Sequence, residues 1–157
     1  MHRISPFLWF DNQAEEAANL YVSVFKDGRV VSTERWGAGG PYPEGSVMSV
    51  SFEIDGRAYQ AFNGGPGQHF TEALSFYVDV DTQEEVDSIW EQLTANGGEP
   101  GRCGWLKDPY GLSWQIVPSG LRELLGDPDP GRASRSMQSM LTMSKLDIAV
   151  LRAAADG

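Results

Sequence analysis

The chain has 157 residues, and its 22 acidic and 12 basic side chains give a net charge of −10 at pH 7. This charge repels phosphate backbones and anionic lipid surfaces, so we expect no nucleic-acid and no membrane partner. Charges interrupt every apolar run, the first residues lack a signal-peptide core, and the single cysteine, Cys103, excludes an internal disulfide. We therefore expect a globular, cytoplasmic protein.

The first predicted elements are a short apolar strand and a helix within residues 7–25. Asn12, with Glu15 three residues later, is typical of a capping box at a helix start. Asp27 and Gly28 end the helical pattern. Small and aromatic side chains fall on one face of this helix and predict its buried side: Ala14, Ala17, Ala18, Tyr21 and Phe25.

A Gly/Pro-rich loop over residues 35–46 follows, and then a predicted hairpin. Residues 47–54 alternate apolar and small polar side chains, as a half-buried strand does. The pair Asp55-Gly56 is a turn signal, and residues 57–62 read as the returning strand.

The same pattern then recurs. "FLWFDNQAEEAANLY" (7–21) resembles "FYVDVDTQEEVDSIW" (76–90) at an offset of 90 − 21 = 69. Gly56 and Gln60 correspond to Gly111 and Gln115 at an offset of 55, and the loop 35–46 accounts for the difference. Thr82 with Glu85 predicts a second capping box, and the buried stripe of the second helix is Val86, Ile89, Trp90 and Leu93.

After Pro118 the pattern changes to one or two helices. This segment carries an apolar set at helical spacing that needs cover, namely Met137, Met140, Leu141 and Met143. We therefore expect the protein to form a homodimer.

Each copy reads as one strand, one helix and about three strands, which predicts an α+β protein. One copy alone leaves a sheet face uncovered, so we expect the two βαβββ modules to pair across a shared concave surface. The expected boundaries within one domain, residues 1–157, are a first module over 4–64, a second over 72–118 and a helical extension over 119–157.

The duplicated unit, with "DPYG" before the last strand, resembles the vicinal oxygen chelate superfamily of glyoxalases, extradiol dioxygenases and bleomycin-resistance proteins. "AEEAANLYVSVF", "CGWLKDPYGLSWQIVP" and "MLTMSKLDIAVLRAA" resemble its PhnB-like branch, often labelled 3-demethylubiquinone-9 3-methyltransferase domain proteins. The resemblance covers residues 4–153 and implies a glyoxalase-like curved mixed sheet. It does not fix the function, because this fold hosts many chemistries.

In metal-using relatives each copy supplies ligands from its first and last strands. By motif these positions fall at Gln60 and Gln115, and, within one residue, at Pro6 and Ser75. Divalent transition metals need imidazole, thiolate or carboxylate ligands, and these four residues offer neither a charge nor an imidazole. We therefore expect no catalytic metal and no other cofactor.

Strand alternation predicts which side chains line the concave surface. With Gln115 facing inward, Trp114 and Ile116 pack on the helix, and Tyr59 likewise faces away from the surface in the first copy. The expected ligand-binding residues are Gln60, Phe62, Ser75, Tyr77, Ser113, Gln115 and Leu8. Such a surface suits a small, mostly apolar ligand held by a few hydrogen bonds, although these side chains could equally fill the interior.

Three functions stay open at this stage. The first is a non-catalytic binding protein, in the manner of the bleomycin-resistance proteins. The second is a superfamily enzyme, whether isomerase, lyase or dioxygenase. The third is a methyltransferase, which we rank last because no Gly-rich strand-to-helix turn for S-adenosylmethionine is visible.

Overall fold

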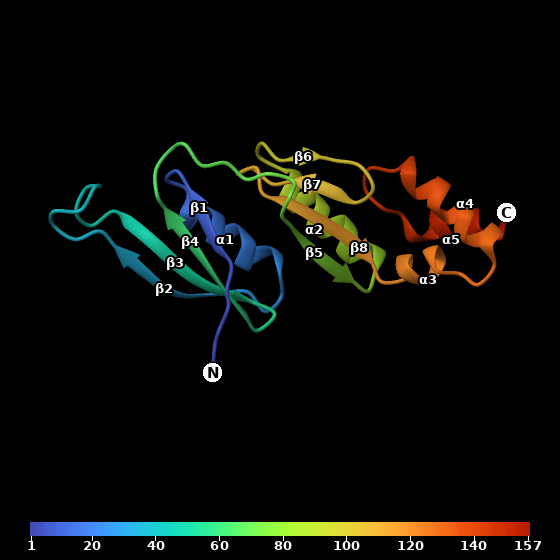
Figure 1. The fold of residues 1–157 in the computed structure, drawn as a ribbon, viewed down its shortest axis with the longest axis horizontal. Helices are drawn as coiled ribbons and strands as arrows, with labels where there is room; N and C mark the ends of the chain where they lie inside the picture. Colours follow the sequence, from blue (N-terminus) through green and yellow to red (C-terminus); the bar gives the residue numbers. More distant parts are fainter. The chain divides into compact units, whose positions relative to one another are not determined.

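The computed structural model describes residues 1–157, which divide into two compact units, Met1–His69 and Phe70–Gly157. The first unit contains β1 (Phe7–Phe10), α1 (Ala14–Val24), β2 (Arg29–Arg35), β3 (Val47–Ile54) and β4 (Arg57–Asn63) (Figure 1). Its four strands form one sheet in the order β1-β4-β3-β2. β1 runs parallel to β4, whereas the other neighbours are antiparallel.

The second unit repeats this arrangement with β5 (Ser75–Val80), α2 (Gln83–Thr94), β6 (Glu99–Pro100), β7 (Trp105–Lys107) and β8 (Ser113–Pro118). The strand order, β5-β8-β7-β6, is the same as in the first unit, with β5 parallel to β8. The extension adds α3 (Leu121–Leu125), α4 (Pro130–Leu141) and α5 (Ile148–Asp156). The predicted duplicated βαβββ pattern with carboxyl-terminal helices is confirmed. None of the helices has the length and apolarity needed to cross a membrane.

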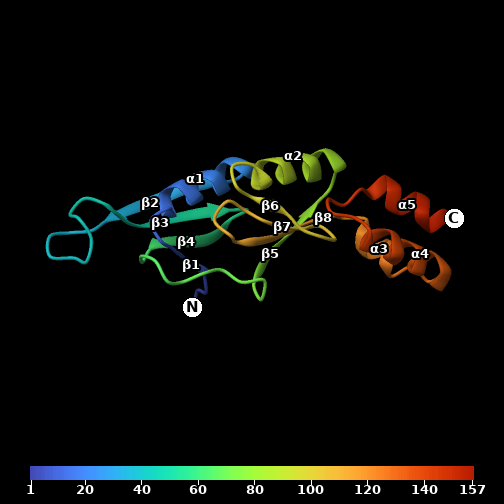
Figure 2. The same cartoon turned by 90° about the horizontal axis from the view of Figure 1, so that it is seen from above.

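α1 and α2 each pack on one face of their own sheet (Figure 2). The buried residues of α2 are the predicted stripe, and α1 buries Ala14, Ala17, Ala18 and Tyr21. Thr82 and Glu85 form the predicted capping box. The prediction for Asn12 is wrong, because the first helical amide, Ala14 N, donates instead to Asn63 Oδ1 at the end of β4, 2.8 Å away.

The turn before β8 is organised by Asp108, whose side chain is buried. Its Oδ1 accepts hydrogen bonds from Tyr110 N at 2.9 Å and Leu112 N at 3.1 Å. Its Oδ2 accepts one from Trp114 Nε1 at 2.9 Å. The "DPYG" motif therefore fixes both the turn and the indole that packs beneath the sheet.

The extension has its own apolar core, which it builds on the last strand. Its buried members are Val117, Leu121, Leu124, Leu146, Leu151 and Ala155. Met140 and Met143 pack against this core, while Met137 and Leu141 are exposed. The expectation that all four residues form one uncovered face is therefore wrong for Met140 and Met143, because the extension covers them itself.

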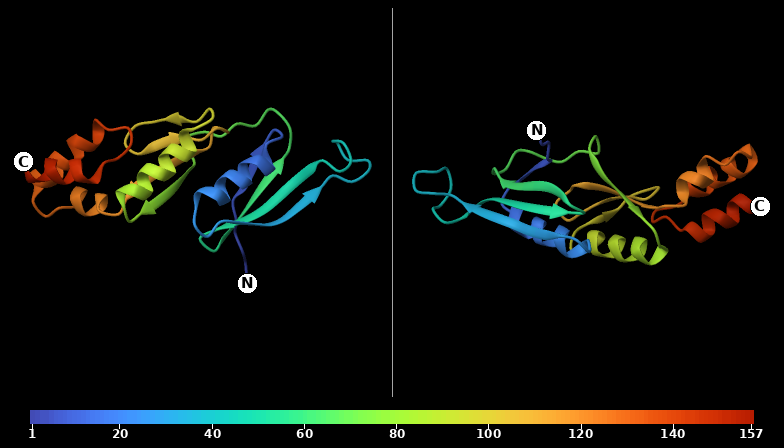
Figure 3. Two further views of the ribbon diagram at one scale, coloured as in Figure 1. Left: turned by 180° about the vertical axis from the view of Figure 1, so that it is seen from behind. Right: turned by 90° about the horizontal axis from the view of Figure 1, so that it is seen from below.

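Hydrogen bonds fix the extension to the rest of the second unit. Gln83 in α2 donates through Nε2 to Leu146 O at 2.9 Å, and its Oε1 accepts from Ile148 N at 3.0 Å. The loop between β6 and β7 donates to Met143 O and Ser144 O through the amides of Cys103 and Gly104. Figure 3 shows α3, α4 and α5 gathered beyond the carboxyl end of β8.

Candidate functional site

The face of the second sheet opposite α2 carries polar and aromatic side chains in two rows, and we call it the second open face. Strand register places Tyr77, Gln115 and Trp105 side by side in one row. The next row consists of Ser75, Ser113 and Lys107. Trp114 and Ile116 alternate with these residues on β8 and are buried on the α2 side, as alternation predicts.

Four of the predicted ligand-binding residues are brought together on this face, namely Ser75, Tyr77, Ser113 and Gln115. Gln115 Nε2 donates to Ser75 Oγ at 3.0 Å. This bond orients the amide and uses one of its two donors, so the other donor and the carbonyl oxygen are available for a ligand. Tyr77 keeps 42% of its surface exposed.

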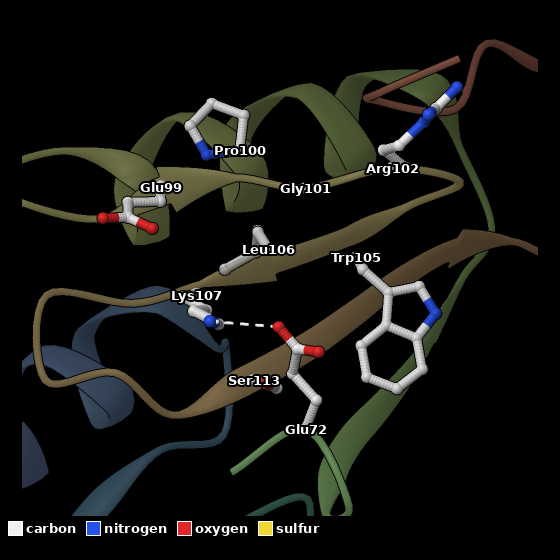
Figure 4. A pocket seen from close by; sticks show the side chains of 9 residues that line it. All are labelled: Glu72, Glu99, Pro100, Gly101, Arg102, Trp105, Leu106, Lys107 and Ser113. Carbon is white, nitrogen blue, oxygen red and sulfur yellow. Dashed lines mark ion pairs between the residues drawn. The ribbon is translucent and has the colours of Figure 1, made fainter. Parts of the chain in front are cut away.

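A hollow of about 410 Å³ lies over part of the second open face (Figure 4). Trp105, Lys107 and Ser113 line it from the sheet, and Glu72, Glu99 and Arg102 are among its other lining residues. Lys107 Nζ forms an ion pair with Glu72 Oε1 at 3.0 Å, and this hydrogen bond raises the pKa of Lys107. The hollow therefore has an aromatic wall and a neutralised cation at its rim.

Ser113 is the unusual group in this hollow. The residue is 1% exposed, and its Oγ forms no hydrogen bond. Most buried polar groups in proteins are paired, and an unpaired hydroxyl costs about 1–3 kcal/mol. Neighbouring atoms cover the hydroxyl, so a ligand in the hollow would recover this cost once those atoms move aside and one of its donor or acceptor atoms reaches Ser113 Oγ.

The corresponding face of the first sheet is aromatic, and it carries Gln60 and Phe62 as predicted. The Phe62 ring lies 5.3 Å from Phe7, 5.2 Å from Trp9 and 6.2 Å from Trp36, measured between centroids. Trp9 Nε1 donates to the Gly65 carbonyl at 2.9 Å. This face is therefore occupied largely by rings that contact one another.

The predicted position of Leu8 on this face is wrong. Leu8 pairs in register with Ala61 and is 3% exposed, so it lies on the α1 side, and Phe7 and Trp9 face the other way. The repeat offset of 69 residues is correct for the two helices but not for the first strands of the two copies. Phe7 pairs in register with Gln60, and Tyr77 pairs with Gln115, so equivalent residues of the first strands are 77 − 7 = 70 positions apart. The connection from β1 to α1 is one residue longer than that from β5 to α2.

The residues that the resemblance implies as metal-ligand positions have side chains that do not suit a divalent transition metal. With the corrected offset the partner of Ser75 in the first copy is Ser5, not Pro6. Each copy then offers one serine and one glutamine, Ser5 with Gln60 and Ser75 with Gln115, and neither pair has a charge or an imidazole. No three His, Cys, Asp or Glu side chains are grouped so that they could hold a metal ion.

Sequence reasoning missed Trp105, Lys107 and Glu72. β7 has only three residues, too few for alternation to stand out, although Trp105 and Lys107 do flank the buried Leu106. Glu72 precedes β5 and meets Lys107 only through the fold. Pairing of β7 with β8 is what places these side chains beside Ser113.

The duplicated βαβββ topology, with one helix-covered face and one open face in each copy, defines a glyoxalase-like fold. Residues 2–117 match the sequence profile of the family described as 3-demethylubiquinone-9 3-methyltransferase. The PhnB protein of Bacillus cereus is 33% identical, with a TM-score of 0.68, and the match covers 74% of this chain and 99% of that chain. The chain belongs to this family.

Other solved structures share the fold at lower identity. Protein PA1353 from Pseudomonas aeruginosa is 19% identical with a TM-score of 0.61, over 75% of this chain and 98% of its own. The fosfomycin resistance protein FosX from Listeria monocytogenes is 16% identical with a TM-score of 0.53, over 78% and 97%. Among curated proteins no significant match was found.

Proposed function

We propose that the chain binds a small, mostly apolar organic molecule on the second open face without a metal ion. The observation that carries this proposal is the buried, unpaired Ser113 Oγ in a hollow of about 410 Å³ beside Trp105. Small-molecule sites typically have about 300–1,000 Å³ and combine apolar walls with a few oriented polar groups. An unpaired hydroxyl in such a place favours a binding site over an ordinary packed surface.

The chemistry of the face indicates the kind of molecule. The Trp105 ring offers an apolar wall, and Ser113 offers one hydroxyl that can donate or accept. Gln115, held by Ser75, offers an amide that can do both. A ligand with an aromatic body and oxygen or nitrogen atoms at its edge fits these groups.

The amide at Gln115 also supports a metal-free function. Gln115 Nε2 donates a hydrogen bond to Ser75 Oγ, so the amide presents an N–H donor, and not an oxygen lone pair, to the serine. A carboxylate at this position would attract a cation through its charge, whereas the amide is neutral. The function we propose is binding without turnover, as in a sequestering protein. We propose that the protein acts in the cytoplasm, because its only cysteine, Cys103, is a free thiol, which suits a reducing compartment.

The family description includes a methyltransferase activity, which the geometry does not favour. S-adenosylmethionine and related cofactors commonly lie against a Gly-rich turn between a strand and a helix. Here the two strand-to-helix connections are Asp11-Asn12-Gln13 and Asp81-Thr82, and neither contains glycine.

Binding can be tested by a fragment screen that follows the indole N–H of Trp105 by NMR. We expect aromatic fragments with polar edges to shift this signal, and Ser113→Ala to weaken their binding about five- to tenfold, since one hydrogen bond is lost. The same variant should fold with unchanged or higher stability, because the hydroxyl it removes is unpaired. Ser119→Ala, an exposed serine beyond β8, is the matched control.

Two results would contradict the proposal. One is a screen in which no fragment moves the Trp105 signal. The other is a Ser113→Ala protein that binds every fragment as the wild type does. Turnover of a bound fragment would instead move the function to a superfamily enzyme.

A further inference from the structure

The extension brings a cation to the second open face. The Arg122 guanidinium carbon lies 5.3 Å from the centroid of the Tyr77 ring, in cation–π geometry. Tyr77 stands in the same row as Gln115 and Trp105. Arg122 lies outside the part of the chain that matches the family profile, residues 2–117, so this cation is not part of the matched family pattern.

The position of Arg122 follows from the packing of α3. Leu121 and Leu124 are buried in the core of the extension, and the intervening Arg122 is turned outward. Val117, two residues after Gln115 on β8, is also part of this core. Gln83 also ties the extension to α2, so the segment that carries Arg122 is anchored to the second unit at both β8 and α2.

The charge of Arg122 is not neutralised by a direct ion pair. Arg29, Lys107, Arg132 and Lys145 each have a carboxylate partner within 3.0 Å. Arg122 has none; the hydrogen bond with Tyr77 and then the charge of Asp79 raise the pKa of its guanidinium. In a chain with a net charge of −10, a fork of donors stacked on an aromatic ring and lacking a carboxylate is a place where a ligand anion can bind.

We propose that Arg122 is a specificity-determining residue that selects an aromatic carboxylate as the ligand of the second open face. The aromatic body lies along the row from Trp105 to Tyr77, and its carboxylate accepts hydrogen bonds from Arg122. This row spans two strand spacings, about 10 Å, which suits a bicyclic aromatic acid. The inference rests on the proposed small-molecule function and adds the charge of the ligand to it.

The test compares 2-naphthoate with its neutral isostere 2-naphthamide, using calorimetric titration and the Trp105 indole signal. We expect the wild type to bind the acid about fivefold more tightly than the amide, the upper range for an exposed ion pair. Arg122→Gln should bring the ratio close to one through weaker binding of the acid, with binding of the amide unchanged. Arg152→Gln, which removes an equal charge from the exposed side of α5, should leave the ratio as in the wild type.

The outcomes separate this inference from the function beneath it. If both probes bind equally to the wild type, or if Arg122→Gln keeps the preference for the acid, the role of Arg122 is refuted and the binding function stands. If neither probe moves the Trp105 signal, both the inference and the proposed binding function fail. A drop in binding of both probes by Arg122→Gln would show a structural role only, which also overturns the inference.

Discussion

Asp108→Asn is the substitution for which the structure makes the sharpest prediction about stability. The Asp108 carboxylate accepts hydrogen bonds from three donors: the amides of Tyr110 and Leu112 at Oδ1, and the indole N–H of Trp114 at Oδ2. A carboxylate can accept from all of them, whereas an amide has one acceptor and one donor end. In either orientation the asparagine NH₂ group must face a buried donor.

The magnitude follows from the hydrogen bonds lost. If the amide oxygen keeps the two backbone bonds, the indole N–H of Trp114 loses its acceptor. Loss of a hydrogen bond to a charged group costs about 1.5–3 kcal/mol, and the buried donor left behind adds its own desolvation. We therefore expect Asp108→Asn to lower the free energy of unfolding by about 3 kcal/mol.

Urea unfolding followed by circular dichroism measures this loss, with Asp11→Asn as the control at an exposed aspartate. In a Trp114→Phe background the indole donor is absent, so Asp108→Asn should cost less there, by about 1–2 kcal/mol in a double-mutant cycle. A loss below about 0.5 kcal/mol in the single variant, or no coupling with Trp114, would refute the reasoning.

Four further predictions concern the extension, assembly and the site. Gln83→Ala removes two hydrogen bonds to the extension, so we expect about 1–3 kcal/mol less stability and faster hydrogen exchange in residues 143–157, while equal exchange would contradict this docking. The hydrogen bond from Lys145 lowers the pKa of Asp87 below its ordinary 3.8. The ion pair therefore stabilises the fold above that value and is lost as the pH falls below it. Lys145→Ala should then cost no more than about 1 kcal/mol at pH 7, and less as the pH falls through the lowered pKa of Asp87, measured by unfolding at each pH. Light scattering should give a homodimer of twice 17.2 kDa, and a clean monomer at all concentrations would remove that idea. Protein purified without an affinity tag should contain no stoichiometric zinc, nickel, manganese or iron; stoichiometric metal that disappears in Gln115→Ala would show that the site binds metal after all.

Most of the fold could be predicted because helical periodicity and the repeat are local signals. The stripe of α2 and its Thr82 capping box are both set by residues within a few positions of one another. The cap of α1 could not be predicted in this way. Its acceptor, Asn63, is 49 residues away from Ala14 and reaches the helix only because β4 pairs with β1.

Part of the second open face could also be predicted, because strand alternation is a local signal. Alternation along β8 correctly placed Ser113 and Gln115 opposite Trp114, because six consecutive residues carry that signal. Leu8 was misplaced because one extra residue in a turn shifts strand phase, and a shift of one residue reverses every side chain. Arg122 and Glu72 could not be found, since only tertiary packing brings them to the face.

The two copies have kept one topology and given their open faces different surfaces. In the first copy the long loop between β2 and β3 carries Trp36 and Tyr42, whose ring centroids are 5.5 Å apart, and the Trp36 ring also lies close to Phe62. In the second copy the equivalent connection, between β6 and β7, is short, and no aromatic loop residues fill the space beside Trp105. The hollow and the unpaired Ser113 hydroxyl lie on this copy, and the extension brings the cation of Arg122 to it. Divergence of a duplicated unit has thus given the two sheets different surroundings, so residues that are equivalent by the repeat, such as Gln60 and Gln115, do not have the same neighbours.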